Sequence, residues 1–400
     1  MAGVLRLITM VCPLALVITM SWFGVFTFVN GYIVKTLGHT DEQWTRATLW
    51  FTGGVIFWQL ICTEISARIG RRKTVTLALA TAAIGYALLA VVRDMRLICP
   101  ILAMMGFPTA ANAVAWMPLI AEAGRDRPGR AVATSQMTIN IVAAGSLIAG
   151  GYLSAGMNHQ RAFLVISVAC ALCAIVFHRL TRPLEGVHSS VLKLSQVSRR
   201  DLLGLLRSPF PYLMLFGLCM EPFNFHTNNQ LFPNLARIKH GLTERQISLI
   251  VALGRLPALI TLIPLAYHID RLRGLRWYGA GLLCAGIAVV WMGMAQGVAA
   301  LVVGFASLYV SYGLIWGSNV ATINGCIEPR LRDSAFAIMN VLLMASVFGV
   351  GGVHNRMLNA GWTFPSVFMF CGAIGSSAGV MLIAYSFSRH FLRSRKAATA

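Results

Sequence analysis

Residues 40–73 read TDEQWTRATLWFTGGVIFWQLICTEISARIGRRK: a polar start, a long apolar run and a basic end. The start places Thr40 three residues before Gln43, the pattern of a capping box, in which the two side chains satisfy free N–H groups in the first helical turn. The apolar run has the ~20 residues that a helix needs to cross a bilayer. The stretch therefore predicts a transmembrane helix followed by a positively charged loop.

The same arrangement returns in residues 243–273, TERQISLIVALGRLPALITLIPLAYHIDRLR. Thr243 and Gln246 match Thr40 and Gln43, and Arg271 matches Arg68, all at an offset of 203 positions. The glycine-rich stretches AAGSLIAGGYL and SVFGVGGVHNRML echo each other at a similar offset. A two-fold repeat of this kind predicts two similar bundles that rock about a site held between them.

The composition of the whole chain supports a membrane protein. Of its 400 residues 57% are hydrophobic and only 12% are charged, and the mean hydropathy is +0.71, far too apolar for an ordinary soluble domain. Apolar segments predict twelve transmembrane helices, and hence an all-α membrane protein of two six-helix bundles. These spans are 7–33, 44–66, 74–92, 97–121, 131–155, 162–180, 209–232, 245–268, 277–296, 299–324, 335–358 and 364–388. We expect an N-terminal bundle (1–180), a cytoplasmic linker (181–208) and a C-terminal bundle with a basic tail (209–400).

The net charge of +20 comes from short basic clusters between the apolar segments, so no basic domain exists that would bind nucleic acid. With the N-terminus in the cytoplasm, 23 Lys and Arg residues fall on the cytoplasmic side and 9 on the other. The positive-inside rule then predicts that both termini are cytoplasmic. We expect the plasma membrane, or the inner membrane of a bacterium, as the location.

The basic end of the opening stretch carries a family resemblance. TEISARIGRRK (63–73) resembles the loop Gly-x-x-x-Asp-Arg-x-Gly-Arg-Arg of the major facilitator superfamily. Four residues match, and two differ: Thr63 replaces the first glycine and Ala67 the aspartate. The matching residues are Arg68, Gly70, Arg71 and Arg72. The corresponding second-half loop, AYHIDRLRG, keeps the aspartate as Asp270, next to Arg271.

The resemblance implies a twelve-helix secondary transporter that works by alternating access. It also implies a cytoplasmic gate, in which the loop charges pair only while that side is closed. The gate residues are Arg68, Gly70, Arg71, Asp270 and Arg271. A role of the first-loop basic residues in setting topology alone is equally compatible with the pattern. The resemblance further implies that helices 3, 6, 9 and 12 are peripheral and that the other helices line the cavity.

Glu221 is the first candidate for the transport site. It lies near the middle of the predicted seventh span, within LCMEPFNFHTNNQLF (218–232). Asn224 and Asn228 share one helix face with it, within about 60°. A charge at this depth costs roughly 2.5–3.5 kcal/mol and favours a substrate, ion or proton site. A structural carboxylate that hydrogen-bonds to neighbouring helices is the alternative. Pro222 denies the carbonyl of Leu218 its usual donor, so we expect the helix to bend or open there.

Arg255, in VALGRLPAL of the eighth span, lies at a similar depth. Two roles are open. The guanidinium could pair with Glu221, because buried charges usually need a partner. It could instead hold an anionic substrate, for which its planar fork of donors is well suited. The roles can be combined, because ligand or proton binding at one partner would free the other.

The remaining polar side chains of the predicted cavity are open between substrate binding and bridging of helices. Asn112 and Asn319 are included in the predicted site, and Asn140 and Asn340 are equivalent cases. His226 lies about 140° around the helix from Glu221, which favours a packed histidine over a proton relay.

We therefore predict a secondary transporter that moves an amphipathic or anionic metabolite, coupled to protons, with no cofactor beyond an ion gradient. The expected partners are the small solute and the lipid bilayer, and the expected state is a monomer. A lone cavity carboxylate also suits efflux of lipophilic cations by proton antiport. A receptor or scaffold without transport activity is the alternative of another class, but it would need no cavity charges. No nucleophile and base, HExxH motif or P-loop indicates an enzyme or a primary pump.

Overall fold

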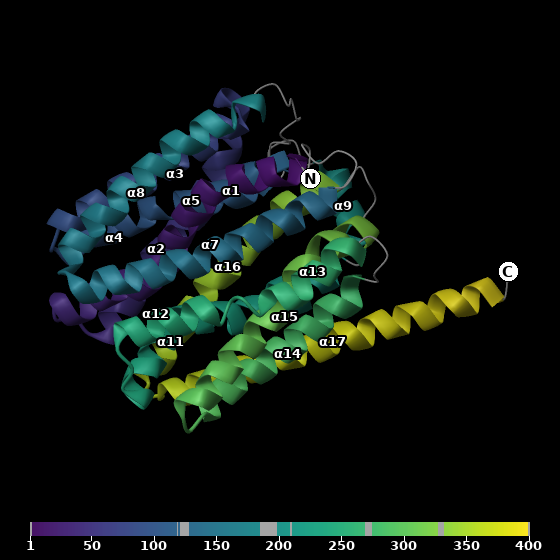
Figure 1. Ribbon diagram of the computed structural model, residues 1–400. Helices are drawn as coiled ribbons and strands as arrows, with labels where there is room; N and C mark the ends of the chain where they lie inside the picture. Colours follow the sequence, from purple (N-terminus) through teal and green to yellow (C-terminus); the bar gives the residue numbers. More distant parts are fainter. Residues whose placement is uncertain are drawn as a thin grey trace.

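The computed structural model describes residues 2–117, 119–120, 128–184, 198–208, 210–268, 274–326 and 332–398, and every regular element within them is a helix (Figure 1). The first half contains α1 (Ala2–Thr19), η1 (Met20–Val29), η2 (Tyr32–Thr36), α2 (Asp41–Ile69), α3 (Arg71–Val91), α4 (Met95–Met105), α5 (Phe107–Ala111), η3 (Asn112–Trp116), α7 (Pro128–Gly156) and α8 (His159–Leu180). The second half contains α10 (Phe210–Leu213), η6 (Met214–Leu218), α11 (Glu221–His240), α12 (Glu244–Leu253), α13 (Ala258–His268), α14 (Gly274–Met294), α15 (Val298–Cys326), α16 (Arg332–Asn359) and α17 (Phe364–Ala398). The short η4 (Arg182–Leu184) and α9 (Arg199–Leu206) lie in the predicted linker.

Within the described residues, eleven helical segments have the length and apolar composition of a membrane span. They correspond to eleven of the twelve predicted spans. The other predicted span, 209–232, is the run of α10, η6 and α11, and α11 continues to His240, eight residues beyond the predicted end. This run is more polar than the others because α11 carries a carboxylate, four asparagines and a glutamine. The predicted all-α membrane fold is confirmed.

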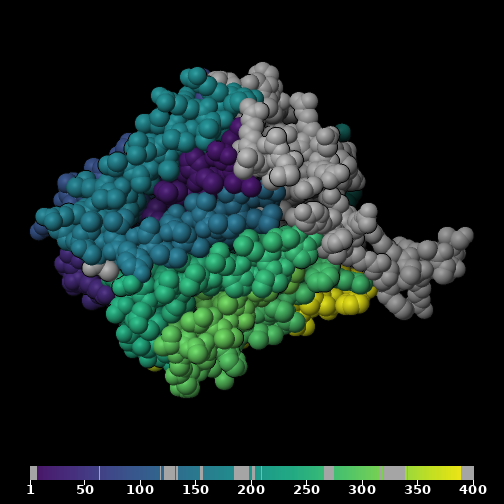
Figure 2. Space-filling view, viewed as in Figure 1, coloured from purple at the N-terminus to yellow at the C-terminus, as the bar shows by residue number. Residues whose placement is uncertain are grey.

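The two halves pack against each other, and Figures 1 and 2 show the first half above the second. In the first half α3 packs against α8, and in the second α14 packs against α15 and α17. Contacts between the halves come from other helices: α7 packs on α12 and α13, α2 packs on α16, and η1 packs on α11. The two ends of the chain point toward the same end of the bundle (Figure 1).

The predicted capping boxes are present in both halves. The backbone N–H of Gln43 donates to Oγ1 of Thr40 over 3.2 Å, and Oε1 of Gln43 accepts from the N–H of Thr40 over 3.0 Å. Thr243 and Gln246 make the same pair of bonds at the start of α12. The repeat read from the sequence therefore places equivalent helix starts at one end of the bundle.

The eighth span differs from its prediction as one helix over 245–268. Pro257 has no N–H to donate to the carbonyl of Leu253, so the chain tightens into a turn between α12 and α13. The N–H of Leu256 donates to that carbonyl instead, over 3.1 Å. Arg255 lies within this turn, at a break that the sequence analysis did not predict.

The seventh span breaks where Pro222 predicted it. The segment Met214–Leu218 is a π-helix, and the N–H of Cys219 donates to the carbonyl of Met214 over 2.9 Å. The regular α-helix resumes only at Glu221. Glu221 is therefore the first residue of α11, directly after an irregular turn.

A close helix contact in the first half depends on one of two adjacent glycines. A Cβ atom at Gly54 would collide with the backbone of Ala103 in α4, whereas a Cβ at Gly53 would meet only the ring of Phe348, at 3.6 Å. We expect Gly54→Ala to lower stability by about 1–3 kcal/mol, because it forces two backbones apart. Gly53→Ala, the matched control, should leave stability nearly unchanged. Thermal unfolding of the purified variants checks this, and equal effects of the two substitutions would contradict it.

Candidate functional site

Glu221 is buried, with 3% of its surface exposed. Its Oε2 accepts a hydrogen bond from the hydroxyl of Tyr278 on α14, over 2.7 Å. Tyr312 of α15 lies within electrostatic reach of the same carboxyl group. In the described part of the chain no cation lies within ion-pair distance of Glu221, and its carboxyl group is hydrogen-bonded to the hydroxyl of Tyr278.

Arg255 is equally buried, with 2% of its surface exposed. Its Nη2 donates to the hydroxyl of Tyr309 on α15 over 2.9 Å, and its Nε has no hydrogen-bond partner. The guanidinium lies over the ring of Phe23 from the first half, 3.2 Å from the ring centroid. No carboxylate of the described residues pairs with it. Of the two roles that the sequence left open, direct pairing with Glu221 is absent.

Two tyrosines of α15 occupy the region between these charges. The ring centroids of Tyr309 and Tyr312 are 5.7 Å apart, one helical turn from each other. Tyr309 binds Arg255, and Tyr312 lies near Glu221 with its buried hydroxyl unpartnered. The site thus contains a guanidinium, a carboxyl group and an unsatisfied hydroxyl, and the breaks in two helices hold the charged residues there.

The predicted neighbours of Glu221 on α11 contact different parts of the structure. Asn224 donates from Nδ2 to the carbonyl of Leu282 in α14 over 3.3 Å and packs against Gly375 of α17. It therefore contacts α14, the helix that also carries the Tyr278 partner of Glu221. Asn228 is 1% exposed, its Oδ1 has no partner, and it lines a small cavity with Phe23 between the halves.

The other asparagines of the predicted site lie apart from this cluster or outside the description. Asn112 begins the π-helix η3 in the first half and is half-buried, with an unpartnered Oδ1. Asn140 bonds within its own helix, to the carbonyl of Gln136. Asn319 and Asn340 lie on α15 and α16, and their side chains fall outside the part that the structure describes.

His226 is fully buried, and neither of its ring nitrogens has a partner. Its ring stacks on that of His354 at 5.9 Å and lies edge-on to Phe26 of the first half at 5.8 Å. His226 is thus packed at the interface between the halves, away from the hydrogen bonds of Glu221.

The gate residues are described only in the first half. Arg68 is exposed and donates to Glu64 of its own helix, over 3.0 Å. Gly70 ends α2 and begins α3 with φ of +85°, a conformation that favours glycine. Arg72, which the sequence matched to the same loop, donates to Oγ1 of Thr181 at the end of α8. Asp270 and Arg271 lie outside the described residues.

Buried hydrogen bonds join the halves at the end where α2 and α12 begin, here called the bonded end. Asn234 of α11 accepts from Asn30 over 3.0 Å and donates to Asp41 over 2.9 Å. Gln230 donates to Thr48 of α2 over 2.7 Å and accepts from His354 over 2.8 Å. One face of α11 therefore binds the first and second helical spans of the other half.

An ion cluster adds to these bonds at the rim. Glu244, the first residue of α12, pairs with Lys35 at 3.0 Å and with His159 of α8 at 3.5 Å. The hydroxyl of Thr36 bonds the other ring nitrogen of His159, at 2.9 Å. Both partners of Glu244 belong to the first half, so the cluster also bridges the interface.

Sequence reasoning did not identify the partners of the two charges or the bonded end. Tyr278 was passed over because helix 9 lacks charges and amides, and a tyrosine in an apolar run is an ordinary interfacial residue. Gln230 and Asn30 carried a usable signal, because amides inside predicted spans need partners there. Asn234 lies two residues beyond the predicted end of the seventh span. Their pairing across the interface depends on the rotation of each helix, which the sequence does not specify.

The comparisons with known proteins define the family. A sequence model of the Major Facilitator Superfamily matches residues 11–243, more than half of the chain. The chain therefore belongs to this superfamily: it is a multi-pass membrane protein and a secondary transporter of a small-molecule substrate. No curated protein matches its sequence.

Solved transporter structures share the fold. The peptide transporter POT in complex with sulfate superposes with a TM-score of 0.73 at 14% identity, covering 96% of this chain and 94% of that chain. The human organic anion transporter MFSD10 (TETRAN) superposes with a TM-score of 0.66 at 14% identity, covering 95% of this chain and 98% of that chain. At this identity the likeness establishes the architecture alone.

The bonded end gives a prediction about conformation. Replacing Gln230 and Asn234 together by leucine removes their hydrogen bonds across the interface, each worth about 0.5–1.5 kcal/mol net. Three such bonds are lost, so we expect the equilibrium constant for opening of the bonded end to rise at least tenfold. Spin labels at Met157 and Trp362, on exposed loops of opposite halves, report the separation. Thr138→Ala, which loses only a bond within its own helix, is the control. An unchanged distance distribution in the double variant would contradict the role of these bonds.

Proposed function

We propose that this transporter carries an anionic, amphipathic solute and that protons drive it. The observation that carries the proposal is Arg255, a fully buried guanidinium with no counter-ion among the described residues. Burying an unpaired charge is costly. A substrate carboxylate or other anionic group would supply the missing charge and accept from the unpartnered Nε.

The aromatic surroundings of Arg255 support an amphipathic ligand. Phe23 covers one face of the guanidinium, and the Tyr309 ring centroid lies 5.0 Å from it. A cation over aromatic rings is partly stabilised while no anion is bound. The same rings would offer apolar contact to the body of a bound solute.

Glu221 is the proposed proton carrier. Its carboxyl group is buried and has one hydroxyl partner, and no cation of the described residues lies within ion-pair distance. Burial without a counter-ion favours the protonated, uncharged form of the carboxyl group. Tyr312 lies near Glu221 with an unpartnered hydroxyl, and its ring is 5.7 Å from that of Tyr309, the partner of Arg255. We infer that substrate at Arg255 and the proton at Glu221 influence each other through these two neighbouring tyrosines.

The charge asymmetry of the loops supports cytoplasmic termini, and the bonded end then faces away from the cytoplasm. In that orientation the structure corresponds to a state closed on the outer side. The proposal also includes a cytoplasmic gate formed by Arg68, Gly70, Arg71, Asp270 and Arg271. It further includes a linker between the two halves at 181–208, a monomeric state, and location in the plasma membrane or a bacterial inner membrane. Asn112, Asn228 and Asn319 remain candidate substrate ligands.

Replacing the guanidinium by an apolar side chain of similar length tests the anion site. In Arg255→Met we expect an unchanged or higher melting temperature without ligand, because an unpaired buried charge is removed. Stabilisation by anions should be lost, although wild type should gain about 2.7 kcal/mol at a concentration 100-fold above Kd. The measurement is a thermal-shift screen with carboxylates, sulfonates, zwitterionic amino acids, sugars and tetraphenylphosphonium.

Arg276→Met is the matched control, since Arg276 also lies over an aromatic ring, that of Phe387, but outside the site. Anion stabilisation that survives in Arg255→Met would contradict the proposal. Stabilisation by tetraphenylphosphonium that requires Glu221 would favour the alternative, efflux of lipophilic cations by proton antiport.

Proton coupling is tested with Glu221→Gln, which keeps an acceptor for the hydroxyl of Tyr278 but cannot ionise. In proteoliposomes we expect a pH gradient to drive accumulation of the identified anion at least tenfold less well than in wild type. Exchange of labelled for unlabelled anion should persist, because it needs no net proton movement. Glu42→Gln, at a glutamate of α2 that pairs with Arg46 of the same helix, serves as control. Gradient-driven uptake at the wild-type level would exclude Glu221 as the proton carrier.

A further inference from the structure

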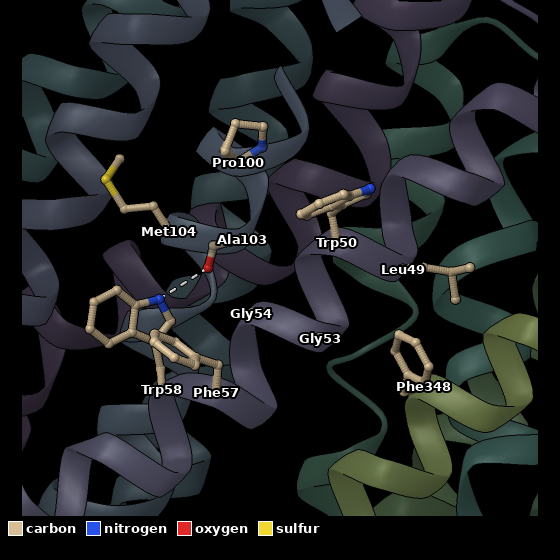
Figure 3. A pocket seen from close by; sticks show the side chains of 10 residues that line it. All are labelled: Leu49, Trp50, Gly53, Gly54, Phe57, Trp58, Pro100, Ala103, Met104 and Phe348. Carbon is tan, nitrogen blue, oxygen red and sulfur yellow. Dashed lines mark hydrogen bonds between the residues drawn. The ribbon is translucent and has the colours of Figure 1, made fainter. Parts of the chain in front are cut away.

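A groove of about 560 Å³ is lined by ten residues, none of which belongs to the charged site. Figure 3 shows these residues. Residues of α2 and α4 form most of its lining, and Phe348 of α16 forms the remaining wall. The groove therefore spans the interface between the two halves.

The groove lies at the depth of the bilayer interior. Its α2 residues run from Leu49 to Trp58, within a 29-residue helix that begins at Asp41. At 1.5 Å per residue they lie roughly 12–26 Å along that helix. The hydrocarbon layer is about 30 Å thick, so this region of the helix is surrounded by acyl chains.

The groove opens outward and is apolar. Trp50 is 56% exposed, Phe57 55% and Phe348 42%, so these rings face the bilayer. The indole N–H of Trp58 donates to the carbonyl of Ala103 over 3.1 Å, so it needs no polar ligand (Figure 3). An ordered water molecule needs two to four polar partners, and this apolar lining does not favour water binding.

The two glycines of α2 shape the floor. Gly54 allows the backbone of α4 to approach, and Gly53 leaves the floor without a side chain beside Phe348. A larger residue at position 53 would occupy the groove. The groove is therefore open because residue 53 is a glycine.

We propose that this groove binds one acyl chain of a bilayer lipid. Its depth, opening and apolar lining require a hydrocarbon occupant, and the bilayer supplies acyl chains at high local concentration. Because α2 and α4 belong to one half and Phe348 to the other, the bound chain contacts both. Its affinity therefore differs between transport states, and the lipid biases the equilibrium toward the arrangement described here.

The test uses the full chain in vesicles of phosphatidylcholine that carries a photoactivatable diazirine at mid-chain. After irradiation, mass spectrometry maps the labelled residues. We expect labelling of the α2 segment 49–58 at least fivefold above that of Val168 and Leu172 on α8, which are 60% and 58% exposed. Gly53→Leu should reduce the α2 label at least fivefold, and Gly53→Ala, which meets only ordinary contacts, should reduce it partly.

Gly349→Leu is the matched control, because Gly349 lies beside Phe348 on α16 and an added Cβ there would have no atom within 4 Å. It should leave the α2 label unchanged. Labelling of α2 no stronger than that of α8, or unaffected by Gly53→Leu in folded protein, would overturn the proposal. Labelling by a diazirine-bearing decanoate but not by the lipid would also overturn it, in favour of the apolar tail of a soluble ligand.

Discussion

Polar groups within a hydrocarbon layer must find their partners inside the protein, and this constraint governs the placement of both buried charges. Glu221 and Arg255 each lie where proline has interrupted a helix, so that the chain leaves the regular hydrogen-bond ladder beside them. An irregular turn changes the direction in which a side chain leaves the helix. Each charged group then meets a tyrosine hydroxyl, Tyr278 or Tyr309, instead of lipid or the opposite charge.

The internal repeat shows how a symmetric fold acquires an asymmetric site. With the 203-residue offset, Pro257 corresponds to Gly54, and Arg255 to Thr52. In the first half α2 continues unbroken through Gly54, which serves a close approach to α4. In the second half the proline breaks the equivalent helix and places a guanidinium at the break. The same backbone position thus supports packing in one half and the candidate site in the other.

The sequence was sufficient for features that depend on local chemistry. The capping boxes of Thr40 and Thr243, the eleven apolar spans and the break at Pro222 follow from neighbouring residues and hydrophobic length. The break at Pro257 was equally local but was not predicted, since a continuous apolar pattern runs through it. The partners of the charges could not be predicted, because they depend on helix rotation. Asn224 shares a helix face with Glu221, and both bond to α14, a helix that the sequence analysis placed outside the cavity.

One helix, α11, links the candidate site to the bonded end. Glu221 begins it, and Asn234 lies 13 residues later, roughly 20 Å away at 1.5 Å per residue. Between them Gln230 bonds to Thr48 in the other half. A helix transmits displacement along its axis, so a change in the charge or contacts of Glu221 that tilts α11 must strain the bonds of Gln230 and Asn234. If substrate and proton act at its first turn, as proposed, they bias the bonded end through this helix without any contact there, because the two arrangements of that end differ in the hydrogen bonds that α11 makes.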